Sequence, residues 1–277
     1  MKNIVVLINE LSEIEPVLEK CANESVMGIK DYTFSAIKKH SIDDMRNHSV
    51  LMNRFYFPNE MDLLKQQLKD LKERNVNHIY FCDPSVYYYA KDLDLVNHLI
   101  YKPDTLTVSA NDVAFWKERG IYTSSLSPLI TEEETDKILD EAENVEVTIH
   151  GHILMSASKR QLLSSYFEDS KQPVQQEKVF YLKEMKREDL MPIYEDDLGT
   201  YIYSDFVLNS FEEITSFHTD RFFIDGIFLS TDELSDAVEA YRNILNGKDE
   251  QIEKENYQAK HANLKFSSGY YKEKTIK

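Results

Sequence analysis

The stretch VEVTIHGHILMSASKRQLLSSYF, residues 145–167, is the most informative part of the chain. It opens with VEVTI at 145–149, a run rich in β-branched residues that is typical of a buried strand. His-Gly follows at 150–151, and a polar, basic turn with the sequence Ser-Lys-Arg lies at 158–160. We interpret residues 145–149 as one strand of a pattern that repeats through the whole chain.

Strand-length apolar runs recur along the chain, and most are followed by the apolar spacing of an amphipathic helix. The strand-like runs cover or lie within residues 3–8, 25–30, 49–57, 77–82, 98–108, 121–126, 145–149 and 221–228. Helical patterns lie at 12–24, 34–40, 58–74, 85–91, 111–120, 131–142 and 231–245. Strands that alternate with helices in this way predict a parallel (β/α)8 TIM-like barrel rather than an open sheet.

A long segment separates the seventh and eighth strands, and its composition indicates β structure. Strand-like runs at 179–182, 191–194 and 200–203 surround Asp-Asp-Leu-Gly at 196–199, which has the composition of a hairpin turn. We therefore expect a β-rich insertion at 168–215, within a barrel that spans residues 1–247. Residues 248–277 are charge-rich and are expected to form a short C-terminal extension, with a helix and the aromatic tail FSSGYY.

The composition is ordinary for a soluble globular protein, with 277 residues, 42% of them hydrophobic and 29% charged. The first apolar run is too short for a signal peptide, and no run approaches the roughly 20 residues of a membrane span. We expect a cytoplasmic protein. The formal net charge of −17 disfavours unaided binding to nucleic acid, because phosphate contacts supply most of the non-specific affinity. It suits a positively charged partner surface.

Several common chemistries lack their motifs. Cys21 and Cys82 form no CxxC pair, which excludes a zinc–thiolate site or a four-cysteine cluster built from this chain alone. The seven glycines are widely spaced, whereas a Rossmann fingerprint, a Walker loop and a nucleophile elbow all need closely spaced glycines. The pattern HExxH is also absent.

Functional side chains of a (β/α)8 barrel gather at the C-terminal ends of its strands. The strand ends and the turn that follows the seventh strand therefore supply the candidate ligand residues of one barrel mouth. These candidates are His150, His152, Lys159, Arg160, Asp83, Asn111 and Asp225.

The two histidines face the same side if the strand continues past the glycine between them. A metal site would need His150, His152 and a third ligand, with Asp83 or Asp225 as candidates. The simpler interpretation is that His150 is a hydrogen-bonded residue of the barrel mouth. We expect no metal.

Two further readings rest on the residues that follow the strand. Lys159 and Arg160 could clamp a carboxylate or phosphate, or they could be ordinary surface charges. A triad of Ser158, His150 and Asp225 can be assembled on paper, but such a triple is expected by chance and no oxyanion-hole glycines accompany it. The sequence contains no autonomous catalytic motif.

The opening stretch resembles the signature segment of the collagenase-like peptidase U-32 family, in which His-Gly is followed by a Ser-Gly-Arg or Ser-Lys-Arg turn and a Leu-Leu-Ser-Asn-Tyr-like run. MPIYEDDLGTYIYS at 191–204 resembles the family's insertion hairpin, IDGI at 224–227 its last-strand motif, and FSSGYY its closing aromatic motif. The segments 83–86 and 109–120 also match. The resemblance extends from about residue 75 to the end, with a shorter and more divergent N-terminal half.

Many members of this family carry cysteines in and just after the signature segment, and those cysteines hold an iron–sulfur cluster. The corresponding places here hold Ile153, Leu154 and Gln161. The chain is most similar to a short branch in Gram-positive bacteria, where two paralogous members are implicated in prephenate-dependent hydroxylation of the tRNA wobble uridine to 5-hydroxyuridine.

The resemblance implies that this chain is the short, cluster-less subunit of a hetero-oligomer with a cysteine-bearing U-32 paralog. It implies no cofactor in this chain, an iron–sulfur cluster in the partner only, prephenate as a ligand, and indirect contact with tRNA. The family's Arg-Glu after the sixth strand is replaced by Ser127-Pro128-Leu129, which favours a scaffold or substrate-presenting role. Two alternatives stay open: a peptidase or collagenase-like hydrolase, as the family name says, and a non-catalytic interaction scaffold.

Overall fold

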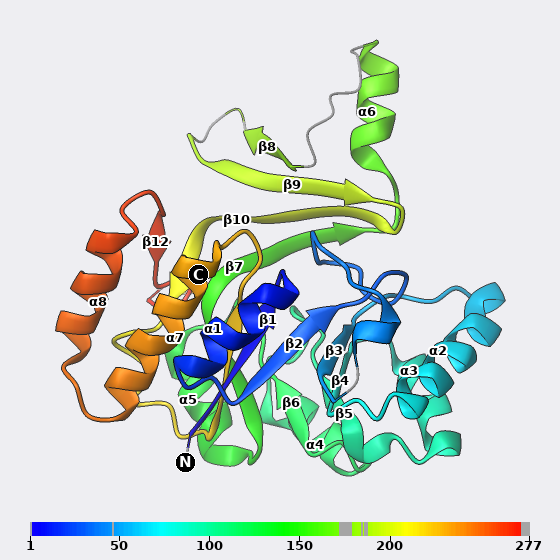
Figure 1. Ribbon diagram of the computed structural model, residues 1–277, viewed down its shortest axis with the longest axis horizontal. Coiled ribbons are helices and arrows are strands. Elements are labelled where there is room, and N and C mark those ends of the chain that lie inside the picture. The colour runs from blue at the N-terminus through cyan, green and yellow to red at the C-terminus, as the bar shows by residue number, and fades with distance from the viewer. Residues whose placement is uncertain (1, 46, 172–178, 184, 186–187, 273–277) are drawn as a thin grey trace.

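Parallel strands close into a barrel in the computed structural model, which describes residues 2–45, 47–171, 179–183, 185 and 188–272 (Figure 1). The first strand pairs with the second and with the last, and the last pairs with the seventh, so the ring is closed. The predicted (β/α)8 barrel is confirmed. Its strands are β1 (Asn3–Ile8), β2 (Glu24–Gly28), β3 (Ser49–Met52), β4 (Ile79–Phe81), β5 (Leu99–Tyr101), β6 (Thr123–Ser125), β7 (Val145–Ser158) and β11 (Arg221–Asp225).

Helices follow most strands and cover the outside of the barrel. Three of them begin at a capping box, including the one predicted at Thr131, whose hydroxyl accepts the N–H of Glu134 while the Glu134 carboxylate accepts the N–H of Thr131. These helices are α1 (Ile14–Glu19), α2 (Met61–Glu73), α3 (Pro84–Ala90), α4 (Ala110–Lys117), α5 (Glu132–Glu141), α7 (Thr231–Leu245) and α8 (Glu250–Lys260). A further helix, α6 (Leu162–Ser170), follows β7 and stands away from the barrel (Figure 1).

The helix predicted at residues 34–40 is wrong, because this segment is an irregular loop after β2. The N–H of Phe34 donates to the Asn53 side chain at 3.0 Å. The hydroxyl of Thr33 accepts the N–H of Ile29 at 2.7 Å. Tertiary and local hydrogen bonds thus replace those of a helix, and the loop lies over the barrel mouth.

Strand β7 is much longer than the predicted 145–149, because it continues out of the barrel to Ser158 (Figure 1). Its outer half pairs antiparallel with β10 (Gly199–Asn209), which pairs with β9 (Leu190–Asp196), and β9 pairs with β8 (Val179–Lys183). Asp196 and Gly199 pair at the predicted hairpin turn. The β-rich insertion between strands seven and eight is therefore confirmed.

Gly151 permits this exit from the barrel. Its φ of +121° is one that L side chains rarely adopt, and an added Cβ would lie 2.2 Å from the carbonyl oxygen of Asp225. The register between β7 and β11 also shifts next to it, between the pairs Phe223–Thr148 and Ile224–His150. The glycine of the His-Gly motif is thus required by close contact with the last barrel strand.

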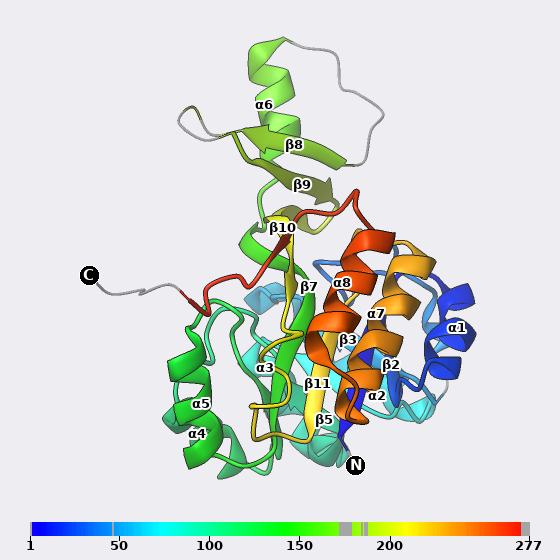
Figure 2. The same ribbon diagram turned by 90° about the vertical axis from the view of Figure 1, so that its left-hand side faces the viewer.

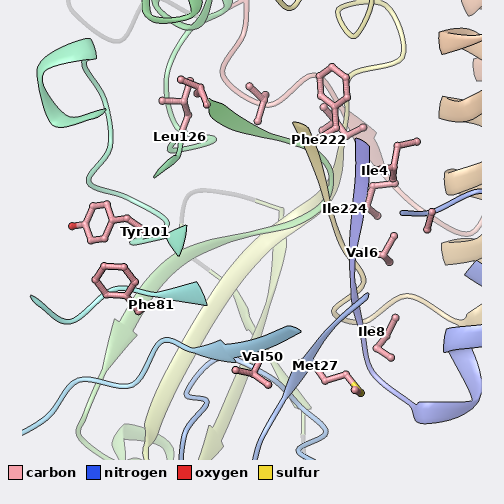
Figure 3. Close-up of a cluster of buried hydrophobic side chains, with 14 of the residues drawn as sticks. Ile4, Val6, Ile8, Met27, Val50, Phe81, Tyr101, Leu126, Phe222 and Ile224 are labelled. Carbon is pink, nitrogen blue, oxygen red and sulfur yellow. The ribbon is translucent and has the colours of Figure 1, made fainter. Parts of the chain in front are cut away.

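Side chains alternate between two cores, as the two-residue period of a strand dictates. Val5 and Leu7 of β1 point into the barrel, whereas Ile4, Val6 and Ile8 pack outside it against the helices (Figure 3). The inner core also contains Val26, Leu51, Tyr80, Ile100 and Phe223. The barrel interior is therefore packed with side chains rather than open.

Below this inner core, an ion-pair network fills the N-terminal end of the barrel. Arg221 donates from Nε to Glu146 at 2.9 Å and from Nη2 to Glu24 at 2.7 Å. The Tyr80 hydroxyl bonds to both Arg221 and Glu146. We call Arg221, Glu146, Glu24 and Tyr80 the floor network.

The C-terminal segment packs against the barrel. Helix α8 contacts α7 on one flank, and the short strand β12 (Phe266–Ser267) pairs with β10 (Figure 2). Tyr271 is buried, and its hydroxyl lies 3.2 Å from that of Ser210. No helix in the described part of the chain is long and apolar enough to cross a membrane.

Candidate functional site

A small enclosed chamber lies at the C-terminal end of the barrel. Its volume of about 20 Å³ corresponds to about one water molecule. The barrel strands supply its base, and the loop after β2, the extension of β7 and strand β10 supply its cover. It is lined by Leu7, Ser35, Leu51, Asn53, Lys102, Asp104, Pro128, Thr148, His152, Ile153, Leu154, Tyr203 and Asp225.

Lys102 is the only lysine of this lining, and its side chain is buried at the end of β5. Its ammonium lies 3.1 Å from Asp104 and 4.5 Å from the ring centroid of Phe223. Burial lowers its pKa, but the nearby carboxylates of Asp104, Glu146 and Asp225 outweigh this and raise the pKa above the ordinary lysine value. Lys102 is therefore a fixed positive charge rather than a neutral amine.

Asp225 ends β11 opposite this ammonium. Burial raises its pKa to about 6, while the N–H of Ile227, which donates at 3.0 Å, and the charge of Lys102 oppose the rise. No other described group donates a hydrogen bond to this carboxylate. Near pH 7 it is therefore mostly ionised and has a free oxygen toward the chamber.

Thr148 and His152 are two further polar residues of the lining. The hydroxyl of Thr148 is buried without a hydrogen-bond partner among the described residues. His152 has Nδ1 at 2.8 Å from the carbonyl oxygen of Ser204, so Nδ1 carries the proton and Nε2 is left as an acceptor. Burial lowers the pKa of His152, which keeps the ring neutral.

A satellite hydrophobic cluster covers the chamber. It consists of Phe34, Tyr194, Tyr201, Tyr203 and Ile227, with Ile37, Leu154 and Phe228 packed against it. We call this cluster the aromatic roof.

Hydrogen bonds tie the roof to the barrel. The Tyr203 hydroxyl donates to the Ser35 carbonyl at 2.9 Å, and Asn53 donates to the Ser35 hydroxyl at 2.7 Å. These bonds hold the loop after β2 across the barrel mouth.

Of the residues predicted to share one mouth, the structure brings together His152 and Asp225. His150 lies elsewhere: it is fully buried outside the barrel, with its ring nitrogens 3.3 Å and 3.1 Å from the hydroxyls of Tyr241 and Tyr257. Burial lowers its pKa to about 3. The register shift beside Gly151 turns the two histidines to different environments, so the expectation that both face one side is not met.

Lys159 and Arg160 lie at the far end of β7. The Lys159 ammonium donates to the Phe55 carbonyl at 2.8 Å and lies 3.4 Å from the centroid of the Phe57 ring. The side chain of Arg160 is exposed. Lys159 therefore fastens the insertion to the loop after β3, and neither residue lines the chamber.

Asp83 and Asn111 also lie outside the chamber lining. Both carboxylate oxygens of Asp83 accept backbone N–H groups, from Ser85 and Tyr56, each at 2.8 Å. Asn111 is exposed in the first turn of α4. Among the described residues, no group of three His, Cys, Asp or Glu side chains is placed to hold a metal ion.

An iron–sulfur cluster does not fit this chain. Most such clusters are held by four thiolates, and the chain has only two cysteines, which lie far apart in the sequence and in no common group of metal-binding side chains among the described residues. Cys82 is buried after β4, where its thiol donates to the Asn53 carbonyl, and Cys21 is exposed after α1.

Sequence reasoning missed three important residues of the chamber: Lys102, Asp104 and Tyr203. The first two lie within residues 98–108, where the fifth strand was expected without a defined end. Functional side chains are expected at the C-terminal ends of the strands, and this expectation points to Lys102 only when β5 is known to end at Tyr101.

The fold and chamber define a class: a closed (β/α)8 barrel whose mouth is covered by a β-rich insertion. Within that class, the model of peptidase family U32 matches residues 3–277, and the chain belongs to this family. The chain is also similar to the tRNA hydroxylation protein P2 of Bacillus subtilis (strain 168). The two are 23% identical over 303 residues, an alignment that covers 99% of this chain and 98% of that protein.

Proposed function

We propose that this protein takes part in tRNA hydroxylation, as a subunit that works with a cluster-bearing U32 paralog. The observation that supports this most directly is the end-to-end similarity to a protein named for tRNA hydroxylation. A similarity confined to the barrel would point to the fold alone, whereas this one includes the insertion and the C-terminal segment.

Two features of the chain favour a subunit over an autonomous enzyme. The two cysteines cannot hold a cluster, so any iron–sulfur chemistry belongs to a partner. The net charge of −17 disfavours tRNA binding by this chain alone and favours tRNA contact through a more basic partner. The proposed product is 5-hydroxyuridine at the wobble position, with prephenate used by the complex.

A peptidase role lacks comparable support. The side chains of Ser158, His150 and Asp225 do not form a catalytic triad. His150 and Ser158 are eight residues apart along one strand, about 26 Å at 3.3 Å per residue. His150 is also enclosed by tyrosines outside the barrel. A casein or gelatin assay on metal-free, thiol-blocked protein tests this alternative, and full hydrolytic activity there would restore it.

The test of the proposed function is nucleoside mass spectrometry of bulk tRNA from a strain that lacks the gene. We expect loss of 5-hydroxyuridine and its derivatives, and recovery when the wild-type gene is returned. An Asp225→Asn gene should fail to restore the nucleoside, although the variant accumulates normally. An unchanged nucleoside profile in the deleted strain, in a background with no second hydroxylation route, would contradict the proposal.

A further inference from the structure

The chamber at the barrel mouth is small and closed. Its volume of about 20 Å³ is enough for one water molecule and far below the roughly 300 Å³ of a typical organic ligand site. The side chains that cover it are buried, with Tyr203 only 1% exposed and Ile153 only 2%. The structure therefore restricts the occupant of the chamber to one water molecule or one small ion.

Two groups of the lining can donate hydrogen bonds into the chamber. An ammonium has three N–H groups, and the described partners of the Lys102 ammonium are the Asp104 carboxylate, at 3.1 Å, and the Phe223 ring, whose centroid is 4.5 Å away. The hydroxyl of Thr148 is buried and has no hydrogen-bond partner in the described part of the chain. One N–H and one O–H therefore remain to be satisfied.

Two other groups of the lining can accept hydrogen bonds there. Asp225 accepts the N–H of Ile227 with one carboxylate oxygen, at 3.0 Å, and its other oxygen accepts from no described residue. Nδ1 of His152 donates to the Ser204 carbonyl at 2.8 Å, so Nε2 of this neutral ring has a free lone pair. Buried polar groups without partners cost free energy, so an occupant that satisfies them is favoured.

This set of two donors and two acceptors selects water over an ion. Water has two O–H groups and two lone pairs, so a single molecule can satisfy all four groups. A cation such as sodium would lie beside the Lys102 ammonium and could not accept hydrogen bonds from it or from Thr148. A chloride ion would lie beside the carboxylates of Asp104 and Asp225, which repel it.

Water at this place also supplies a link that the side chains do not make directly. Lys102 and Asp225 both line the chamber, but the ion pair that Lys102 makes within the described ranges is with Asp104. A bridging water is enthalpically nearly as good as a direct hydrogen bond, so it can hold the two charged groups in fixed positions.

We propose that the chamber is a binding site for one ordered water molecule. The water accepts hydrogen bonds from Lys102 and Thr148. It donates to the free oxygen of Asp225 and to Nε2 of His152. The ends of β5 and β11 and the middle of β7 thereby share one hydrogen-bond network at the barrel mouth, and this network does not depend on the function proposed above.

The direct test is a crystal structure of the whole chain at a resolution that shows ordered water. We expect one density peak in the chamber, within hydrogen-bond distance of at least three of the four groups. A chamber without such a peak would overturn the proposal, as would a peak with the coordination distances of a metal ion or a halide.

The second test is the sign of a stability change. Thr148→Val replaces the hydroxyl with a methyl group of similar size, so it removes one partner of the water, and we expect the equilibrium constant for unfolding to rise about fivefold. Thr107→Val is the matched control, because the Thr107 hydroxyl is also buried without a partner among the described residues but does not line the chamber.

Removal of a hydroxyl that bonds to nothing is neutral or stabilising, so Thr107→Val should leave the unfolding constant unchanged or lower it. Both constants come from urea unfolding at pH 7.5. A constant for Thr148→Val no higher than that of wild type would show that the hydroxyl has no partner, and would overturn the proposal. An equal rise in the two variants would show that the effect is not specific to the chamber, with the same consequence.

Discussion

Replacement of His150 by glutamine should reduce the acid sensitivity of the fold by an amount that the structure sets. His150 is fully buried between two tyrosines, and its pKa is lowered to about 3 from the ordinary value of 6.5, mainly by burial. The unfolded chain therefore binds a proton below pH 6.5 that the folded chain does not bind until about pH 3. The resulting stabilisation is complete above pH 6.5 and is lost as the pH falls toward the folded pKa.

The magnitude follows from these two pKa values. Between pH 7.5 and pH 5.0, linkage gives a loss of about 2 kcal/mol from His150 alone. The measurement is urea unfolding of wild type and His150→Gln at both pH values, followed by far-UV circular dichroism. For each protein, the loss is the decrease in the free energy of unfolding between pH 7.5 and pH 5.0. The quantity compared is this loss in wild type minus the same loss in the variant, because the hydrogen bonds that the variant lacks at both pH values then cancel.

His218→Gln is the control, since the His218 side chain is 76% exposed and its removal should leave the acid loss close to that of wild type. If His150→Gln lost as much stability between pH 7.5 and 5.0 as wild type does, within about 0.5 kcal/mol, the assignment of His150 as a neutral, buried ring would be refuted.

Three other variants probe the mouth, the exit of β7 and the barrel floor. Asp225→Asn should increase the loss of stability between pH 7.5 and 5.0 by about 1 kcal/mol, because a carboxyl whose pKa is raised to about 6 takes up its proton in the folded state first. The same urea series measures this change, and a decrease would contradict the sign. Gly151→Ala should lower the free energy of unfolding by more than about 4 kcal/mol or prevent folding. The control is Gly247→Ala, where φ is also positive, at +92°, but the space is open, and it should cost about 1 to 2 kcal/mol. Equal decreases in melting temperature for the two variants would argue against the clash of an added Cβ with β11. Arg221→Met should cost about 3 to 5 kcal/mol in denaturant unfolding because it leaves the fully buried Glu146 carboxylate without its cationic partner. A loss no larger than that of the partly exposed Arg119→Met would show that the network is dispensable.

The barrel was predictable because its signals are local and repeated. Most strands have a short apolar run, and helix starts such as Ser109, Thr131 and Ser230 carry capping residues that act within one turn. The hairpin at 196–199 was predictable for the same reason. The loop at 34–40 was not, because its conformation depends on Asn53 and Tyr203, which are distant in sequence.

The site was predictable only in part, because strand ends decide it and strand ends are poorly marked. Asp225 was found from its place before a glycine at the end of a clear apolar run. Lys102 was hidden inside a broad strand region, and Tyr203 belongs to the insertion rather than to a barrel strand. The environment of His150 depends on a one-residue register shift, which no periodicity argument includes.

Most of the motif residues that carry the family resemblance lie where the insertion joins the barrel. Gly151 allows β7 to cross the carbonyl of Asp225, and Gly226 allows the next turn to approach Leu7, whose carbonyl oxygen would lie 2.3 Å from an added Cβ. His150 anchors the same crossing from outside through the tyrosines of α7 and α8. The contacts that fix this junction also place Asp225 under the aromatic roof. A change at the junction should therefore move the chamber and the roof together. The position of the chamber residues thus depends on signature residues that do not line the chamber themselves.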